Sequence, residues 1–167
     1  MAKTNKKKGS NGRVSAGLLM YRLSGGELEV FLAHPGGPHF ARKDEGHWTA
    51  PKGETEPGEA LLETAQREFF EETNLTPNGP YIELGWIRQK GGKIVHAWAF
   101  EGNLGPKDEV RSIEFQMEWP PKSGKLARFP EVDRAEFFHW QEASVKIKPT
   151  QIPFIDRLRA ALFTSAP

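Results

Sequence analysis

Hydrophobic and polar residues follow the two-residue period of a β-strand over much of this chain. Short apolar or alternating runs between Gly- and Pro-containing segments predict strands; they lie at residues 13–23, 28–33, 47–53, 81–89, 93–100 and 112–119. Turn sequences at residues 24–26 and 90–92 join two pairs of these strands into hairpins. Residues 34–44 and 120–130 are rich in Gly, Pro and basic residues, so we predict loops there.

Two segments have the longer period of a helix. Residues 59–74 contain no Gly or Pro and are rich in Ala, Leu, Glu and Gln. Residues 151–163 form an amphipathic helix, and its inward face is Phe154, Ile155, Leu158 and Leu162. With an aromatic strand inside residues 131–143, the order is β-β-β-α-β-β-β-β-α. This order predicts an α/β fold in which a mixed β-sheet is sandwiched between helices, as one domain over residues 13–164.

The composition narrows the class of protein. The 167 residues include five Trp and eleven Phe, enough for a domain with an apolar core. Cysteine is absent, which excludes disulfides, thiol nucleophiles and cysteine-based zinc sites. The formal net charge is +1, which gives no overall case for nucleic-acid binding. No apolar run is long enough for a membrane span or a secretory signal, so we expect a cytoplasmic protein.

Lysines cluster near the start of the chain, at positions 3 and 6–8. We predict that residues 1–12 are a disordered basic tail in which these side chains are solvated. A nucleic-acid-binding arm is the alternative interpretation, which tight and salt-sensitive RNA binding would favour.

The helix at residues 59–74 carries an acidic face. Glu68, Glu71 and Glu72 fall within an arc of about 100°, and the neighbouring arc is apolar: Leu62, Ala65 and Phe69. Carboxylates three and four residues apart repel one another, and Arg67 relieves only part of this repulsion. Oxygen ligands at this spacing suit Mg²⁺ or Mn²⁺ rather than zinc. A solvated acidic face is the alternative that this pattern leaves open by itself.

The spacing of a longer stretch, residues 53–75, distinguishes these interpretations. It resembles the Nudix box, G-x5-E-x7-R-E-U-x-E-E-x-G-U, where U is a bulky apolar residue. The matching residues are Gly53, Glu59, Arg67, Glu68, Phe69, Glu71, Glu72 and Leu75. Asn74 stands where the family has glycine, and Asn is the next most tolerant residue of the left-handed conformation that ends a helix. The resemblance implies the Nudix fold over most of the chain.

The same resemblance implies hydrolysis of a nucleoside diphosphate linked to another moiety, with Mg²⁺ or Mn²⁺ as cofactor. It assigns Glu68 and Glu72 as direct metal ligands, and Glu71 as a third ligand or one bound through water. A backbone carbonyl near Gly53 is a further ligand in the family. Arg67 is expected to orient a ligand carboxylate. Glu59 is expected either to orient the metal ligands in the same way or to be an outer metal ligand.

A further ligand or base is expected from the segment around residues 131–143. Many Nudix domains have an acidic residue shortly before an aromatic strand, followed by a helix start, and Glu131 takes that place here. Asp133, Glu136 and Glu118 are competitors for it. The general base stays open among Glu71, Glu68 and Glu131.

Candidate substrate-binding residues lie outside the box. Lys52 precedes it in the lead-in His47-Trp48-x-x-Pro51-Lys52-Gly53, which looks somewhat like that of diadenosine polyphosphate hydrolases. His39 and Arg42 lie in the loop at residues 34–44, beside the box. Trp98 could stack on a base, although packing in the core is the alternative.

Three other functions are alternatives to hydrolysis. A non-catalytic nucleotide sensor would not need the complete Glu set. Isomerisation of isoprenoid diphosphates in this fold relies on a catalytic Cys, which this chain lacks. RNA 5′-end processing has weak support from the basic tail. We therefore expect a nucleotide-type small molecule as the partner, rather than a nucleic acid or a membrane.

Overall fold

The first strand, β1 (Val14–Ser24), is the axis around which the chain folds. The structure is a computed structural model that describes residues 13–164. β1 pairs antiparallel with β2 (Glu27–Pro35) at one end and with the short β3 (Lys52–Glu54) at the other, and parallel with β5 (Ile94–Glu101). Because core packs on both of its faces, β1 is apolar without alternation over most of its length.

Two further strands extend this sheet. β4 (Ile82–Arg88) pairs antiparallel with β5, and β8 (Val132–His139) pairs antiparallel with β2. The strand order is β4–β5–β1–β2–β8, with β3 beside β1. The short 3-10 turn η1 (Lys90–Gly92) closes the hairpin between β4 and β5, at the place where the sequence predicts a turn.

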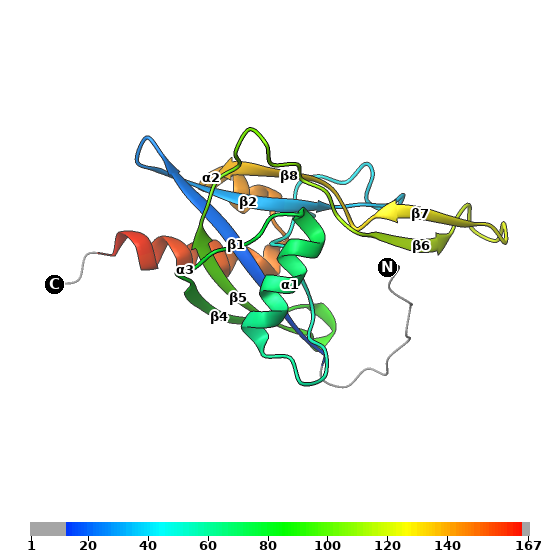
Figure 1. Cartoon of the computed structure of the whole chain (residues 1–167), viewed down its shortest axis with the longest axis horizontal. Coiled ribbons are helices and arrows are strands. Elements are labelled where there is room, and N and C mark those ends of the chain that lie inside the picture. Colours follow the sequence, from blue (N-terminus) through cyan, green and yellow to red (C-terminus); the bar gives the residue numbers. More distant parts are fainter. Residues whose placement is uncertain (1–12, 165–167) are drawn as a thin grey trace.

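Helices cover both faces of the sheet (Figure 1). On one face α1 (Leu61–Thr73) packs on β1; this cluster includes Ala16, Leu18, Met20, Ala65, Phe69 and Phe100. The other face carries α2 (Trp140–Lys146), the 3-10 turn η2 (Pro149–Gln151) and α3 (Ile152–Phe163); this cluster includes Leu19, Ala97, Ile147, Phe154, Ile155 and Leu158. The predicted α/β/α arrangement is confirmed.

The end of α1 has the geometry that the sequence predicts. Asn74 adopts a left-handed conformation, with φ of 64°, and its N–H donates to the carbonyl of Phe70. The residue that replaces the family's glycine therefore performs the same task.

The prediction of a loop at residues 120–130 was wrong in its second half. Residues Leu126–Pro130 form strand β7, which pairs antiparallel with β6 (Glu114–Glu118) in a separate two-stranded sheet. This hairpin projects from the body of the molecule (Figure 1). Phe115 and Phe129 stack across it, with ring centroids 6.0 Å apart. The Pro and basic residues that suggested a loop occupy its turn and its exposed face.

Smaller differences concern the ends of elements. Of the predicted strand at residues 47–53, only its end contributes to β3, which the structure places at Lys52–Glu54. One helix, α2, comes before the terminal helix in addition to the predicted order. Within residues 13–164, no helix has the length and apolar character needed to cross a membrane. The predicted tail at residues 1–12 lies outside the described residues.

Candidate active site

Three carboxylates from two distant parts of the chain converge beside β3. Glu68 and Glu72 come from α1, and Glu131 lies between β7 and β8. One carboxylate oxygen from each lies within 4.8 Å of the others. Burial of Ala65 and Phe69 against the sheet fixes the rotation of α1. Glu68 and Glu72, each three residues after one of these positions, therefore face β3.

The backbone around Glu131 is held in place by hydrogen bonds. Its N–H donates to the carbonyl of Ile113, and its carbonyl accepts from the N–H of Gly36, each at 2.9 Å. The N–H of Ile113 in turn donates to the carbonyl of Glu71 at the end of α1, also at 2.9 Å. The root of the projecting hairpin therefore ties Glu131 to the helix that carries the other two carboxylates.

β3 passes very close to the carboxylates. A Cβ added at Gly53 would lie 2.0 Å from the carboxyl carbon of Glu68, so only glycine fits there. The N–H of Lys52 donates to Oε2 of Glu72 at 3.1 Å. The glycine at the first position of the box pattern thus has a steric reason in this chain: it leaves room for a carboxylate against the backbone.

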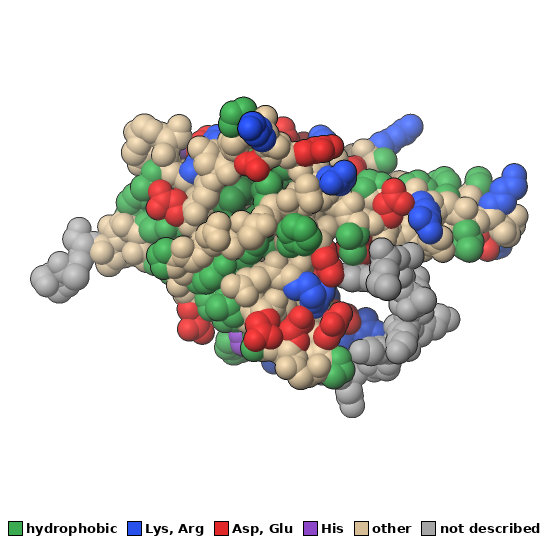
Figure 2. All heavy atoms as spheres, in the orientation of Figure 1, with side chains coloured by type: hydrophobic (Ala, Val, Ile, Leu, Met, Phe, Trp, Pro, Cys, Tyr) green, Lys and Arg blue, Asp and Glu red, His purple; other side chains and the backbone are tan. Residues whose placement is uncertain are grey.

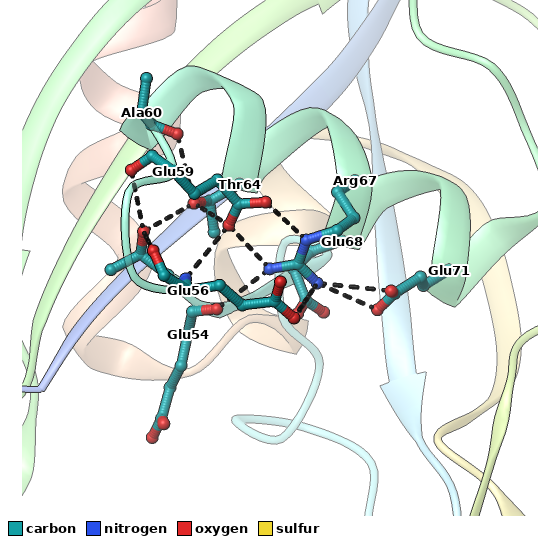
Figure 3. A network of polar contacts seen from close by, with 9 residues as sticks. Glu54, Glu56, Glu59, Ala60, Thr64, Arg67, Glu68 and Glu71 are labelled. Atoms are coloured by element: carbon teal, nitrogen blue, oxygen red, sulfur yellow. Dashed lines mark hydrogen bonds and ion pairs between the residues drawn. The ribbon is translucent and has the colours of Figure 1, made fainter. Parts of the chain in front are cut away.

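Arg67 links the acidic groups of the helix (Figure 3). Its guanidinium donates to both carboxylate oxygens of Glu59, at 2.7 and 2.9 Å. It also donates to Glu68 at 2.9 Å and to both oxygens of Glu71 at 3.3 Å. The bond to Arg67 lowers the pKa of Glu59 to about 2. Arg67 therefore keeps Glu59 ionised and fixes where the carboxylates of all three partners point.

The carboxylate of Glu72 lies in a buried and negatively charged environment. Burial raises the pKa of Glu72, and the nearby charge of Glu68 raises it further. On the face shown in Figure 2, acidic side chains also gather over α1 and the segment that leads into it. A divalent cation would relieve this repulsion. An all-oxygen set within 4.8 Å fits Mg²⁺ or Mn²⁺.

The structure brings together most of the residues that the sequence singled out. A cavity of about 390 Å³ lies between β3, α1 and Glu131; its lining includes Lys52, Gly53, Glu68, Glu72 and Glu131. Glu71 lies at the edge of this group and turns its carboxylate toward Arg67. Glu59 supports Arg67 from the other side.

Other predicted residues lie away from this cavity. His39 and Arg42 are exposed, and the His39 ring packs edge-on against Trp119 at 5.7 Å. Trp98 is half-buried against the cluster beneath α1. Asp133 pairs with His34 at 2.7 Å, and Glu118 accepts a hydrogen bond from the N–H of Lys122.

Sequence reasoning missed three charged residues in the lining of the cavity, Glu54, Glu56 and Lys93. Glu54 ends β3, directly after the first glycine of the box. Lys93 stands immediately before β5, the strand parallel to β1. The sequence predicts Lys93 at the start of a strand. It does not predict that this strand pairs with β1, which brings Lys93 close to β3.

Comparisons with known proteins agree with this geometry. Residues 12–158 match the NUDIX domain family. The chain is 40% identical to bis(5'-nucleosyl)-tetraphosphatase [asymmetrical] of Caenorhabditis elegans over 111 residues, 63% of this chain and 75% of that protein. It is 41% identical to the enzyme of that name from Rattus norvegicus over 61 residues, 33% of this chain but only 42% of that protein.

Solved structures show the same likeness. A C. elegans Ap4A hydrolase binary complex superposes with a TM-score of 0.62 and 25% identity, covering 92% of this chain and 100% of that one. The NUDIX domain of Shewanella oneidensis NrtR, complexed with ADP ribose, superposes with a TM-score of 0.60 and 14% identity, covering 89% and 87%. The second likeness extends to the fold alone.

Proposed function

Because this chain belongs to the Nudix family and is a pyrophosphohydrolase, we propose that it cleaves nucleoside diphosphates linked to another moiety with bound Mg²⁺ or Mn²⁺. The observation that carries this proposal is the convergence of Glu68, Glu72 and Glu131 within 4.8 Å. Together with the carbonyl of Gly53, these residues would hold the cation. When bound, the cation neutralises the diphosphate and lowers the pKa of an attacking water.

Dinucleoside polyphosphates are the substrates that we propose first. The support is the name of the relatives in C. elegans and rat, together with the lead-in from His47 to Gly53. Hydrolysis would place the oxygen of water on one phosphorus while the bridging P–O bond breaks and its electrons leave with the departing phosphate.

Among the candidate bases Glu68, Glu71 and Glu131, we propose Glu131. Arg67 hydrogen-bonds to Glu68 and Glu71, so the carboxylates of both residues already accept from a charged donor. Glu131 comes from the opposite side of the cavity to the helix carboxylates that Arg67 holds. With one carboxylate oxygen on the cation, its second oxygen would take the proton of the attacking water. Lys52, beside Gly53, would contact phosphate oxygens.

The experiment is a substrate panel with purified protein. Nucleotide-linked diphosphates, dinucleoside polyphosphates and a capped RNA are incubated with Mg²⁺ or Mn²⁺, and both products are identified by mass spectrometry. We expect hydrolysis of a nucleotide substrate, and none in excess chelator. Binding without any product would instead indicate a sensor, and cleavage of the capped RNA alone would indicate RNA 5′-end processing.

Substitution of a proposed metal ligand gives the sharpest test. Glu72→Gln keeps the size of the side chain but weakens its charge interaction with the cation, so we expect the rate to fall about 100-fold or more. Glu63→Gln is the matched control, because Glu63 is exposed on the same helix, and its rate should stay within about twofold of wild type. Equal rates for wild type and Glu72→Gln would contradict the proposed site.

A further inference from the structure

A buried histidine on β2 faces the start of β8, the strand that follows Glu131. His34, the last residue but one of β2, is fully buried. Its Nε2 lies 2.6 Å from the carbonyl oxygen of Lys43, and its ring packs edge-on against Trp48 with the centroids 5.1 Å apart. A carbonyl oxygen only accepts hydrogen bonds, so Nε2 carries a hydrogen and donates. The strand, the loop and the indole ring together hold the imidazole in one orientation.

The second ring nitrogen of His34 binds an acidic residue two positions after Glu131. Nδ1 lies 2.7 Å from Oδ1 of Asp133. Two lone pairs at this distance would repel each other, so one proton lies between these two atoms. Short bonds to a carboxyl group are among the stronger hydrogen bonds in proteins. The side chain of Asp133 is therefore tied to a ring whose own position is fixed.

Asp133 is the extra residue of a β-bulge. In the register of β2 and β8, His34 pairs with Arg134 but Pro35 pairs with Val132, so the pairing skips Asp133. Pro35 has no N–H to give to the ladder, and a proline inside a sheet is typically found at a bulge. The bond from the side chain of Asp133 to His34 holds this extra residue in place of a register partner.

The bulge sets the position of Glu131. Because Asp133 is inserted just after it, the alignment of Glu131 with the end of β2 depends on the extra residue. One residue of a strand spans about 3.3 Å, while the three carboxylates lie within 4.8 Å of one another. A slip by one residue would therefore move Glu131 away from Glu68 and Glu72. It would also break the hydrogen bond from the N–H of Gly36 to the carbonyl of Glu131.

We propose that His34 is a positioning residue for the candidate active site: through Asp133 it holds the bulge that brings Glu131 to the other two carboxylates. This inference rests on the proposed function, because it concerns a ligand of the same cation. His34 and Asp133 both lie outside the lining of the cavity, so they act through the backbone between residues 131 and 133. Loss of their bond should weaken cation binding although every ligand is still present.

Binding of Mn²⁺ to the full chain, measured calorimetrically without substrate, tests this proposal apart from catalysis. Asp133→Ala is the first variant, because the side chain of Asp133 is 31% exposed whereas His34 is fully buried and its replacement would disturb the packing. We expect the Kd for Mn²⁺ to rise about tenfold, as on loss of other groups that orient metal ligands. Asp156→Ala makes the same change at an exposed position on α3 and should leave the Kd unaltered.

A conservative variant separates the hydrogen bond to His34 from the charge of Asp133, which also lies 3.9 Å from Arg134. Asp133→Asn removes the charge, but its amide group can donate to Nδ1 of His34 while Nε2 keeps its hydrogen. We therefore expect Asp133→Asn to bind Mn²⁺ within about threefold of wild type, since the hydrogen bond is retained. A loss as large as that in Asp133→Ala would contradict the role of His34.

A double-mutant cycle identifies the ligand that the pair positions. In Glu131→Gln, the addition of Asp133→Ala should raise the Kd by less than about twofold, because the two changes act on the same ligand. An unchanged Kd in Asp133→Ala, or its full effect in the Glu131→Gln background, would overturn the inference. Hydrolysis by the wild type together with normal Mn²⁺ binding by Asp133→Ala would leave only the proposed function. The expected Mn²⁺ affinities in a protein that hydrolyses no nucleotide would support the inference and remove the proposed function.

Discussion

At the scale of single residues, Arg67 decides how the acidic groups are arranged. One guanidinium contacts the carboxylates of Glu59, Glu68 and Glu71 (Figure 3), and it also donates to the carbonyl of Glu54 at 3.2 Å. Its planar fork matches both oxygens of Glu59, which a lysine could not do. Glu59 therefore acts through Arg67. Its loss should lower the free energy of unfolding more clearly than it lowers the rate of hydrolysis.

The ion pair between Glu59 and Arg67 predicts a pH-dependent stability. The pKa of Glu59 falls from an ordinary value of 4.5 to about 2 on folding. The stabilisation is therefore complete above pH 4.5 and is lost as the pH falls toward 2. In chelator near pH 7, the free energy of unfolding of Glu59→Gln should be about 2 kcal/mol lower than that of wild type.

Denaturant titrations of both proteins at several pH values measure this difference. We expect the gap between wild type and Glu59→Gln to narrow steadily below pH 4.5. A gap of constant size down to pH 3 would show that the charge of Glu59 is not what stabilises the fold.

At the scale of elements, the root of the β6–β7 hairpin positions the third carboxylate. The hydroxyl of Ser112 accepts a hydrogen bond from the N–H of Val132 at 3.0 Å, next to Glu131. Gly36 approaches from β2, and a Cβ there would lie 2.0 Å from the carbonyl oxygen of Pro130. A hairpin that looks peripheral is thus anchored directly beside the candidate active site.

Loss of the Ser112 hydroxyl should disturb Glu131. Ser112→Ala leaves the N–H of Val132, a buried residue, without its acceptor. We expect a stability loss of about 1 to 3 kcal/mol and about a tenfold higher Mg²⁺ concentration for half-maximal activity.

A matched control lies at the other end of the same hairpin. The Ser123 hydroxyl accepts from the N–H of Lys125 at an exposed position, so Ser123→Ala should change stability by less than about 0.5 kcal/mol. An unchanged Mg²⁺ requirement in Ser112→Ala would show that the hairpin root does not position Glu131.

At the scale of the whole molecule, the cation should stabilise the fold. The candidate site joins α1, in the helix layer, to β3 and to the residue before β8, both in the sheet layer. A ligand that binds only the folded state adds its binding free energy to stability, about 1.4 kcal/mol at ten times its Kd. Relief of the repulsion among the three carboxylates also makes the bound cation stabilise the folded state.

Thermal unfolding measures this effect. Mg²⁺ at about ten times its Kd should raise the Tm by about 3 to 5 °C in a chain of this size. Glu72→Gln should show little of this rise, while Glu63→Gln should keep it. An equal rise in Glu72→Gln would mean that Mg²⁺ acts elsewhere on the protein.

Much of the helix and its chemistry could be predicted because both depend on local geometry. The period of α1 brings Glu68 and Glu72 to one face whatever surrounds them, and Asn74 ends the helix through its own backbone conformation. β7 could not be predicted in this way, because its Pro and basic residues oppose a strand and only pairing with β6 stabilises it. Strand alternation left two roles open for Trp98, stacking on a base or packing in the core. Its packing beneath α1 could not be predicted, because it depends on where that helix lies.

By itself, the sequence determined which acidic residues share one face of α1, since backbone periodicity and the spacing of the box require no distant partner. Only the tertiary structure decided which distant residues meet them. Glu131 reaches the helix through the hydrogen bonds of the hairpin root, and Lys93 reaches Glu54 of β3 because β5 lies parallel to β1. Such long-range contacts depend on the order of the strands and on how the layers pack. The pattern of residues along the chain does not specify either of these.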